Sequence, residues 1–428
     1  LYSRAEMARI AAEHRFSELR ELANYMIFDL DRRLETLPGT TASRRELVGR
    51  GQKYLDALGR TAPADSELQR EVTVGLTRLA EVQGVPGRAH VGEIAAARTN
   101  LERAEAMLIA GRHDEPGQWT WRRDLAQVRY LLALVYGGRD NDNERQLAKA
   151  VQAESDVASA LRDAQALSVS GQPLAGLHEL LTSVRLVQAD AHKWLKAIDV
   201  AHKLQSSEEQ RLLALPADLR AQMDFDFQVG RLALLSGDSL YYLDRKPEAL
   251  AAYRRGAASF DKALAHQPSN RKRIEGAIHA HWYLASVRSE LGDPNGALDD
   301  SDTALRIVER LLQLDPDNLE ARRIGEAVSG DRAGILSAAG RHDDAIRLVE
   351  SNLVVRGARI TRQPDDAEAL RDLAVPLRTL ADIYERKGDR VGACKVLGRA
   401  HEVWTQVDRR FGLGDFDRKN ELAVVEMR

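Results

Sequence analysis

The chain has 428 residues, and its 62 Lys and Arg residues nearly balance 65 Asp and Glu residues, giving a formal net charge of −3. Non-specific nucleic-acid binding needs a clear basic excess to displace counterions, so the charge argues against a nucleic-acid partner. Aromatic residues are 5% of the chain, and Ala, Leu, Arg and Glu are abundant, which is typical of an all-helical protein. No stretch approaches the roughly 18 apolar residues of a membrane span, so we expect no membrane insertion within this chain.

The N-terminal part is predicted to be helical. Apolar residues recur at helical spacing over residues 3–37, which predicts one long amphipathic helix. Two more helices are predicted to begin at capping boxes, one with Ser43 and Glu46 and the next with Ser66 and Gln69.

The middle of the chain predicts less regular helices. They are expected over 119–136, 143–167 and 174–204. A further capping box is predicted at Ser206 and Glu209. Helix pairing between 143 and 236 stays open, because Ala201 falls in step with later small residues but has no turn signal beside it.

Small residues and prolines recur at a step of 48 residues in the C-terminal part, which is the signature of a repeat architecture. The recurring positions are Gly237, Ala285, Ala333 and Ala381; Ala249, Ala297, Ala345 and Ala393; and Pro268, Pro316 and Pro364. Small side chains let two antiparallel helices approach closely, and a proline stops the second helix. Each unit is therefore predicted to be a helical hairpin.

These observations divide the chain into four predicted parts. They are an N-terminal helix with the first hairpins (1–110), irregular hairpins (111–236), the 48-residue repeats (237–411) and a C-terminal capping helix (412–428).

The spacing of small residues resembles the tetratricopeptide repeat (TPR), whose eighth and twentieth positions match the two ladders of Gly and Ala. Two features depart from that family: the period is 48 instead of 34 residues, and Arg288 and Arg332 stand where leucine or tyrosine is usual. The resemblance implies an all-α, right-handed superhelical solenoid of antiparallel hairpins, and a concave face that binds a protein or peptide.

A second resemblance covers roughly residues 12–110. This region is similar to the one that precedes TPR hairpins in bacterial membrane-anchored signalling proteins, among them eukaryotic-type serine/threonine kinases. The resemblance is carried by Arg15-Phe16, Leu22-Ala23-Asn24, Phe28-Asp29-Leu30, Leu37 to Thr41, Tyr54-Leu55-Asp56 and Val82-Gln83-Gly84. It implies a sensor or docking module on the extracytoplasmic side of a membrane. The start at Leu1, without methionine, fits a fragment whose anchor and catalytic domain lie elsewhere.

We expect no catalytic residues, no metal and no cofactor. Asp224-Phe225-Asp226 and Asp415-Phe416-Asp417 lack the glycine of a kinase metal site. Asp140 opens a stretch that mimics a calcium loop, but Arg145 replaces the required glycine. His279 and His281 fall on different helix faces, and no Cys or acidic ligand lies at a zinc-like spacing.

The single cysteine, Cys394, lies where other repeats have Leu250, Leu298 and Ile346. It is expected to be a small buried hydrophobe instead of a reactive thiol.

The candidate partner-binding residues are those that the TPR register turns toward the concave face. They are Arg231, Leu234, Tyr241, His279, Trp282, Arg378, Asp382 and Arg386. Trp, Tyr and Arg have the character of interface hot spots. The alternative is that they only pack between neighbouring hairpins.

Two functional hypotheses follow. The first is a non-enzymatic, protein- or peptide-binding sensor or docking module of a bacterial signalling protein. The second is a cytoplasmic TPR scaffold that self-assembles through residues 3–37 and senses no ligand. An enzyme with a new site between hairpins is a third and weaker alternative.

Overall fold

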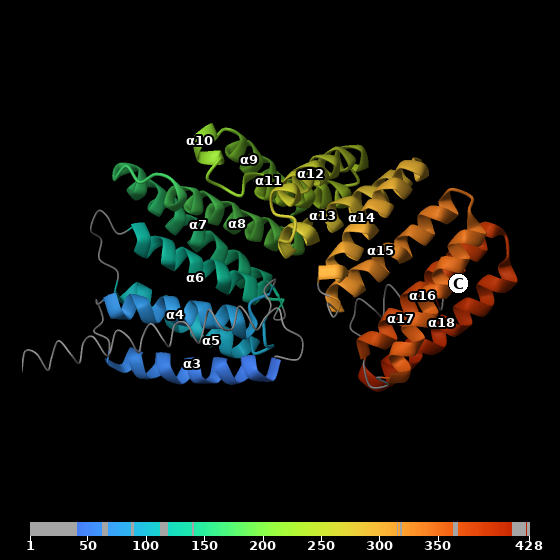
Figure 1. Ribbon diagram of the computed structural model, residues 1–428, viewed down its shortest axis with the longest axis horizontal. Helices are drawn as coiled ribbons and strands as arrows, with labels where there is room; N and C mark the ends of the chain where they lie inside the picture. Colours follow the sequence, from blue (N-terminus) through green and yellow to red (C-terminus); the bar gives the residue numbers. More distant parts are fainter. Residues whose placement is uncertain are drawn as a thin grey trace, which may run out of the picture. The chain divides into compact units, whose positions relative to one another are not determined.

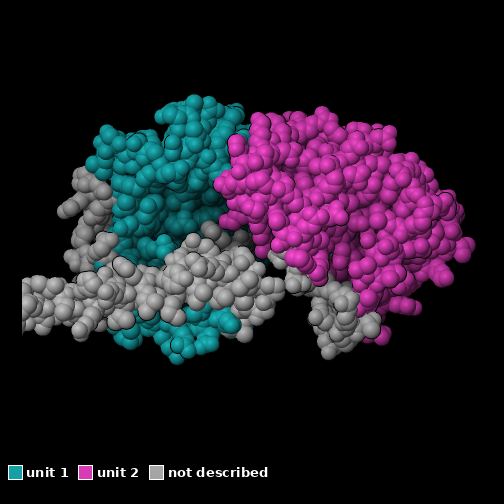
Figure 2. Space-filling view, viewed as in Figure 1, with its two compact units in different colours: residues 1–243 teal, residues 244–428 magenta. Residues whose placement is uncertain are grey.

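The structure is a computed structural model that describes residues 41–61, 67–86, 90–111, 119–138, 141–314, 316, 319–362, 367–412 and 425. All regular secondary structure in these residues is α-helical, which confirms the predicted fold class (Figure 1). The chain divides into two compact units, Leu1–Leu243 and Asp244–Arg428 (Figure 2). The predicted helix over 3–37 lies outside the described residues, as does the predicted capping helix except for Val425.

The first unit is a series of helices, most of which pack on the next one along the chain. They are α3 (Thr41–Thr61), α4 (Glu67–Gly84), α5 (Ile94–Ala110), α6 (Trp119–Gly137), α7 (Asn143–Ala166), α8 (Gln172–Trp194), α9 (Ile198–Leu213), the single turn α10 (Ala217–Arg220) and α11 (Phe225–Tyr242). Contacts also join α4 to α6, α6 to α8 and α8 to α11. Helices α4, α6, α8 and α11 therefore lie in one row. Of these, α4, α6 and α8 are the first helices of hairpins α4–α5, α6–α7 and α8–α9.

The second unit repeats the arrangement with helices of more uniform length, each of 20 to 22 residues. They are α12 (Lys246–His266), α13 (Arg271–Glu290), α14 (Pro294–Leu314), α15 (Leu319–Ala338), α16 (His342–Arg362), α17 (Ala367–Lys387) and α18 (Arg390–Phe411). Hairpins α13–α14, α15–α16 and α17–α18 stack in order, and contacts of α15 with α13 and α17 place the three first helices in one row.

The predicted ladders of small residues lie where the helices of a hairpin meet. Ala297 and Ala345 are fully buried at the start of the second helices α14 and α16. Ala333 and Ala381 are equally buried on the first helices. A larger side chain at these points would push the two helices apart, which explains why the sequence keeps them small.

The turn inside each hairpin repeats in atomic detail. Gly292, Gly340 and Gly388 have φ values of 85°, 77° and 86°. The residue after each of these glycines donates its N–H at 2.9 Å to a carbonyl five residues back. This left-handed turn reverses the chain and leaves the second helix antiparallel to the first.

The 48-residue period of turns and buried alanines begins earlier in the chain than the sequence pattern indicates. Lys196 lies two steps of 48 before Gly292 and has φ 63°, and the N–H of Ala197 donates at 2.8 Å to the carbonyl of His192. Ala201 is fully buried, like Ala249. The helix predicted over 174–204 is therefore wrong: it is two helices, α8 and α9. No glycine marks the break, because a lysine adopts the left-handed conformation there.

Two predicted capping boxes are also wrong. Ser206 and Glu209 lie inside α9, and Ser43 lies inside α3. Ser and Glu are tolerated within helices, so this short pattern does not require a helix start. Ser66 lies outside the described residues.

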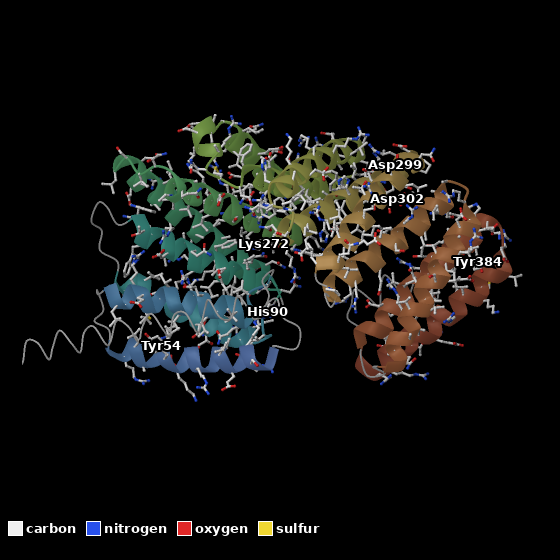
Figure 3. The ribbon with its side chains drawn as sticks, in the orientation of Figure 1. Tyr54, His90, Lys272, Asp299, Asp302 and Tyr384 are labelled. Atoms are coloured by element: carbon white, nitrogen blue, oxygen red, sulfur yellow. The ribbon has the colours of Figure 1, made fainter. Side chains whose placement is uncertain are left out.

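Neighbouring helices pack closely around buried aromatic and aliphatic side chains. A Cβ atom on Gly276 of α13 would lie 2.2 Å from Cε1 of Phe260 in α12, so only glycine fits there. Tyr54 of α3 and Tyr384 of α17 pack at the edges of the cores of their units (Figure 3). Val425 is buried in the same core as Tyr384.

The two arginines that depart from the TPR pattern are paired. Arg288 lies 3.1 Å from Asp300, and Arg332 lies 2.5 Å from Asp302 of α14, which Figure 3 labels. The Arg288 pair joins the two helices of hairpin α13–α14, whereas the Arg332 pair joins α15 to α14 of the preceding hairpin. In both places an ion pair between packed helices stands where the TPR pattern has a hydrophobic contact.

Cys394 is exposed, so its predicted burial is wrong. The corresponding Leu298 and Ile346 are buried because another hairpin follows them. Cys394 belongs to α18, the last of the hairpin helices that the structure describes.

Candidate functional site

A cavity of 460 Å³ opens on the row of first helices in the second unit. Its lining comes from α13, α15 and α17, with one arginine from α16. Its volume lies within the roughly 300–1,000 Å³ of typical ligand pockets. Three successive repeats therefore contribute to one concave site.

Trp282 lies at the junction of α13 and α15. Its indole N–H donates a hydrogen bond of 2.6 Å to Oδ2 of Asp331. The ring centroids of His279 and Tyr283 lie 6.0 and 5.4 Å from that of Trp282. The Nδ1 atom of His279 lies 2.8 Å from the carbonyl of Glu275, which orients its ring. The cavity thus has an aromatic wall that is fixed by hydrogen bonds.

Asp331 combines solvent exposure with partial desolvation. Its side chain reaches solvent, yet the surrounding concave protein surface removes much of the bulk water around the carboxylate. This desolvation raises the pKa of the Asp331 carboxyl, and the hydrogen bond from Trp282 opposes the rise. The carboxylate is therefore less well solvated than one on a flat surface.

A proline in α17 shapes the opposite wall. Pro376 has no N–H, so the carbonyl of Asp372, four residues earlier, has no helical hydrogen-bond donor. The Nη1 atom of Arg356, on α16, donates to this carbonyl instead. The proline thereby draws a buried arginine from a second helix to the cavity.

The charged side chains of the cavity are mostly paired with each other. Nε of Arg356 lies 3.2 Å from Oε2 of Glu326, and Nε of Arg323 lies 3.9 Å from Oδ2 of Asp372. These pairs cross between α15, α16 and α17, so they hold the cavity's walls together.

Two of the eight predicted residues, His279 and Trp282, line the cavity. Arg378 and Asp382 are half-buried on α17, and Arg386 is exposed near its end, but none of these three belongs to the lining.

The other three predicted residues belong to α11 in the first unit. Arg231 lies 3.3 Å from Ser183 of α8 and 3.1 Å from Gln228, and it covers the ring of Phe227. Tyr241 makes an edge contact with Tyr242, and Leu234 is half-buried. Arg231 thus has the packing role that the sequence left open.

Several cavity residues were missed, although the repeat register points to some of them. Steps of 48 lead from His279 to Ala327 and Val375, and from Tyr283 to Asp331 and Thr379. All of these except Tyr283 line the cavity. Arg356 has no such signal, because it belongs to a second helix.

The remaining motifs have local roles. Asp142 caps α7 by accepting a hydrogen bond of 3.0 Å from the N–H of Arg145, as expected of a simple turn. The N–H of Asp224 donates at 2.6 Å to Glu179. The described residues include no group of three or more His, Cys, Asp or Glu side chains placed to hold a metal. Among the described helices, none is both long and apolar enough for a bilayer crossing.

No family model and no curated protein sequence matches the chain. Among solved structures, the apo form of the quorum sensor NprR from B. thuringiensis is similar with a TM-score of 0.53 and 12% identity, over 93% of this chain and 94% of that one. A Rap protein complexed with Competence and Sporulation Factor has a TM-score of 0.45 and 12% identity, over 95% and 94% of the two chains.

A third similar structure is a signal transduction ATPase with a tetratricopeptide repeat sensor from Pyrococcus horikoshii. Its TM-score is 0.46 and its identity 15%, over 90% of this chain and 50% of that one. The similarity to NprR spans nearly the whole of both chains. The fold is a TPR-like solenoid of helical hairpins.

Proposed function

We propose that this protein is a non-enzymatic scaffold that binds a peptide segment of a partner in the cavity formed by α13, α15 and α17. The observation that carries this proposal is the partly exposed Trp282, held by Asp331, in a concave site built by three successive repeats. A large aromatic side chain in such a site supplies the contact area of an interface hot spot.

The fold supports this role. Stacked hairpins present a long concave surface, and each repeat adds side chains that contact the next part of an extended peptide. The similar solved structures include a quorum sensor and a Rap protein in complex with a factor, which fits sensing by binding. Similarity at 12% identity shows the fold alone, so the cavity carries the proposal.

The experiment is a selection from a random peptide-display library on the immobilised wild-type chain, after which the affinity of each enriched peptide is measured for the wild-type chain and for the Trp282→Ala variant. We expect enriched peptides to bind the wild-type chain at least about tenfold more tightly than the variant. Peptides that bind both chains equally would place recognition elsewhere and contradict the proposal. Arg386→Ala, on the same row but outside the cavity, is the matched control.

We further propose, from the resemblance of residues 12–110, that the chain is the extracytoplasmic part of a membrane-anchored bacterial signalling protein. The test is protease added to intact cells that produce the full-length protein with a tag after Arg428. Loss of the tag supports this location, and protection until lysis supports the cytoplasmic alternative. Self-association through residues 3–37 stays a prediction, to be tested by light scattering with and without that segment.

A further inference from the structure

The charges that line the cavity do not cancel. Its lining includes three carboxylates, those of Glu326, Asp331 and Asp372, and two guanidinium groups, those of Arg323 and Arg356. Arg356 pairs with Glu326, and Arg323 pairs with Asp372. Within the described part of the chain, Asp331 accepts a hydrogen bond from the neutral indole of Trp282 and pairs with no cation. One negative charge is therefore left for a ligand.

The surroundings of Asp331 suit a cation that is flat and weakly hydrated. The indole of Trp282 offers a π surface beside the carboxylate, and a cation over an indole is attracted by the ring's quadrupole. Val375 and Pro376 supply an apolar wall from α17, along which an aliphatic stem can lie. A guanidinium group combines these properties better than an ammonium, because it is planar and less strongly hydrated.

We infer that the cavity is the receptor for an arginine side chain of the bound peptide, stacked on Trp282 and paired with Asp331. This inference rests on the proposed function and names the chemistry of its ligand. An acidic side chain would meet the uncompensated carboxylate of Asp331 instead. Partial desolvation of that carboxylate makes pairing with a cation more favourable than on an open surface.

The test uses the full chain labelled with 5-fluorotryptophan. Its five tryptophans give five ¹⁹F resonances, and the Trp282→Phe variant identifies that of Trp282. The probes are the capped tripeptide acetyl-Ala-Arg-Ala-amide and its citrulline analogue, which has the same shape without the charge. We expect the arginine peptide to shift the Trp282 resonance saturably, with a Kd of about 1 mM, and the citrulline peptide to bind at least about tenfold more weakly.

The Asp331→Asn variant tests the carboxylate directly. Asparagine retains an oxygen that can accept the indole N–H but removes the charge, so we expect about tenfold weaker arginine binding. Asp382→Asn, on α17 outside the cavity, is the matched control and should bind like the wild-type chain. A thermal melt of each variant checks that it is folded.

Three results would overturn the inference: equal binding of the arginine and citrulline peptides, no shift of the Trp282 resonance, or unchanged affinity in Asp331→Asn. The peptide-display selection keeps the proposed function separate. Trp282-dependent peptides without arginine would uphold the proposed function and reject the arginine receptor.

Discussion

Trp282 and Asp331 join two successive first helices, α13 and α15, through one hydrogen bond of 2.6 Å between the indole N–H and a carboxylate oxygen. The two residues belong to different repeats, so the bond fixes the aromatic wall relative to the next hairpin. A solenoid has no single core, and contacts between neighbouring repeats hold its binding surface in shape.

The contact between Arg356 and the Asp372 carbonyl gives a first prediction. Replacing Arg356 with Met leaves this carbonyl and the Glu326 carboxylate without their donor, so we expect a loss of about 2–4 kcal/mol in the free energy of unfolding. In a Pro376→Ala background the N–H of residue 376 can donate to the same carbonyl. The Arg356→Met change should then cost about 1 kcal/mol less, measured by urea unfolding of the four chains. If the losses in the free energy of unfolding from the two single substitutions simply add in the double variant, then Arg356 does not replace the missing helical hydrogen bond.

The close approach of α12 and α13 gives a second prediction. Gly276→Ala places a methyl group against the buried ring of Phe260, so we expect a loss of about 1–3 kcal/mol and a lower melting temperature. Gly334 is the matched control, because a Cβ atom there meets open space within α15. Gly334→Ala should be neutral or stabilise by up to about 1 kcal/mol. Equal melting temperatures for both variants would mean that the two helices can separate without cost.

A third prediction concerns the dependence of stability on pH. His281 is buried between Asp261, at 3.2 Å, and Asp300, at 3.4 Å. Burial alone lowers the pKa of His281, but hydrogen bonds and attraction to the two carboxylates outweigh it and raise the pKa to about 9. Because the folded pKa exceeds the unfolded value of about 6.5, the stabilisation is complete below pH 6.5 and is lost as pH rises to about 9.

The expected loss over this range is up to about 3 kcal/mol, measured by urea unfolding at pH 6.5 and pH 9. A His281→Gln variant cannot be protonated and should lose this part of the pH dependence. His178 does not interfere, since burial lowers its pKa to about 4 and its effect falls below pH 6.5. If the free energy of unfolding of His281→Gln depends on pH as that of the wild-type chain does, His281 is not the group responsible for the loss of stability between pH 6.5 and pH 9.

The buried carboxylate of Glu208 gives a fourth prediction, in the first unit. It lies 2.6 Å from Arg185, 2.5 Å from Arg211 and 2.6 Å from the hydroxyl of Thr182. Burial tends to raise the pKa of Glu208, but these partners lower it below its ordinary value. Glu208→Gln leaves two guanidinium groups without their shared carboxylate, so we expect a loss of about 3 kcal/mol in urea unfolding. The exposed Glu144→Gln change should stay within about 0.5 kcal/mol.

The repeat architecture could be predicted from the sequence because its constraints are local. Alanines such as Ala249 and Ala297 must be small where helices cross, and residues such as Gly292 must adopt a positive φ, so both leave periodic marks. The break at Lys196 left no mark. Lysine and alanine are good helix formers, and packing of α9 overrides their preference there.

About half of the residues that line the cavity could have been predicted from the 48-residue period. Asp331 and Thr379 follow Tyr283 at steps of 48, whereas Arg378 and Asp382 fall on neighbouring faces of α17. The role of Arg356 could not be predicted, because it depends on a carbonyl that Pro376 leaves without a donor in another helix. Such a contact depends on how the helices lie in three dimensions, and no regular spacing of residues in the sequence indicates it.

The most direct test of the proposed binding site is the affinity of a library-selected peptide for the wild-type chain and for Trp282→Ala, measured by isothermal titration calorimetry. We expect the peptide to bind Trp282→Ala at least about tenfold more weakly than the wild-type chain, and to bind Arg386→Ala with unchanged affinity, both variants being folded. Equal affinity for all three chains would contradict the assignment of the α13, α15 and α17 cavity as the binding site.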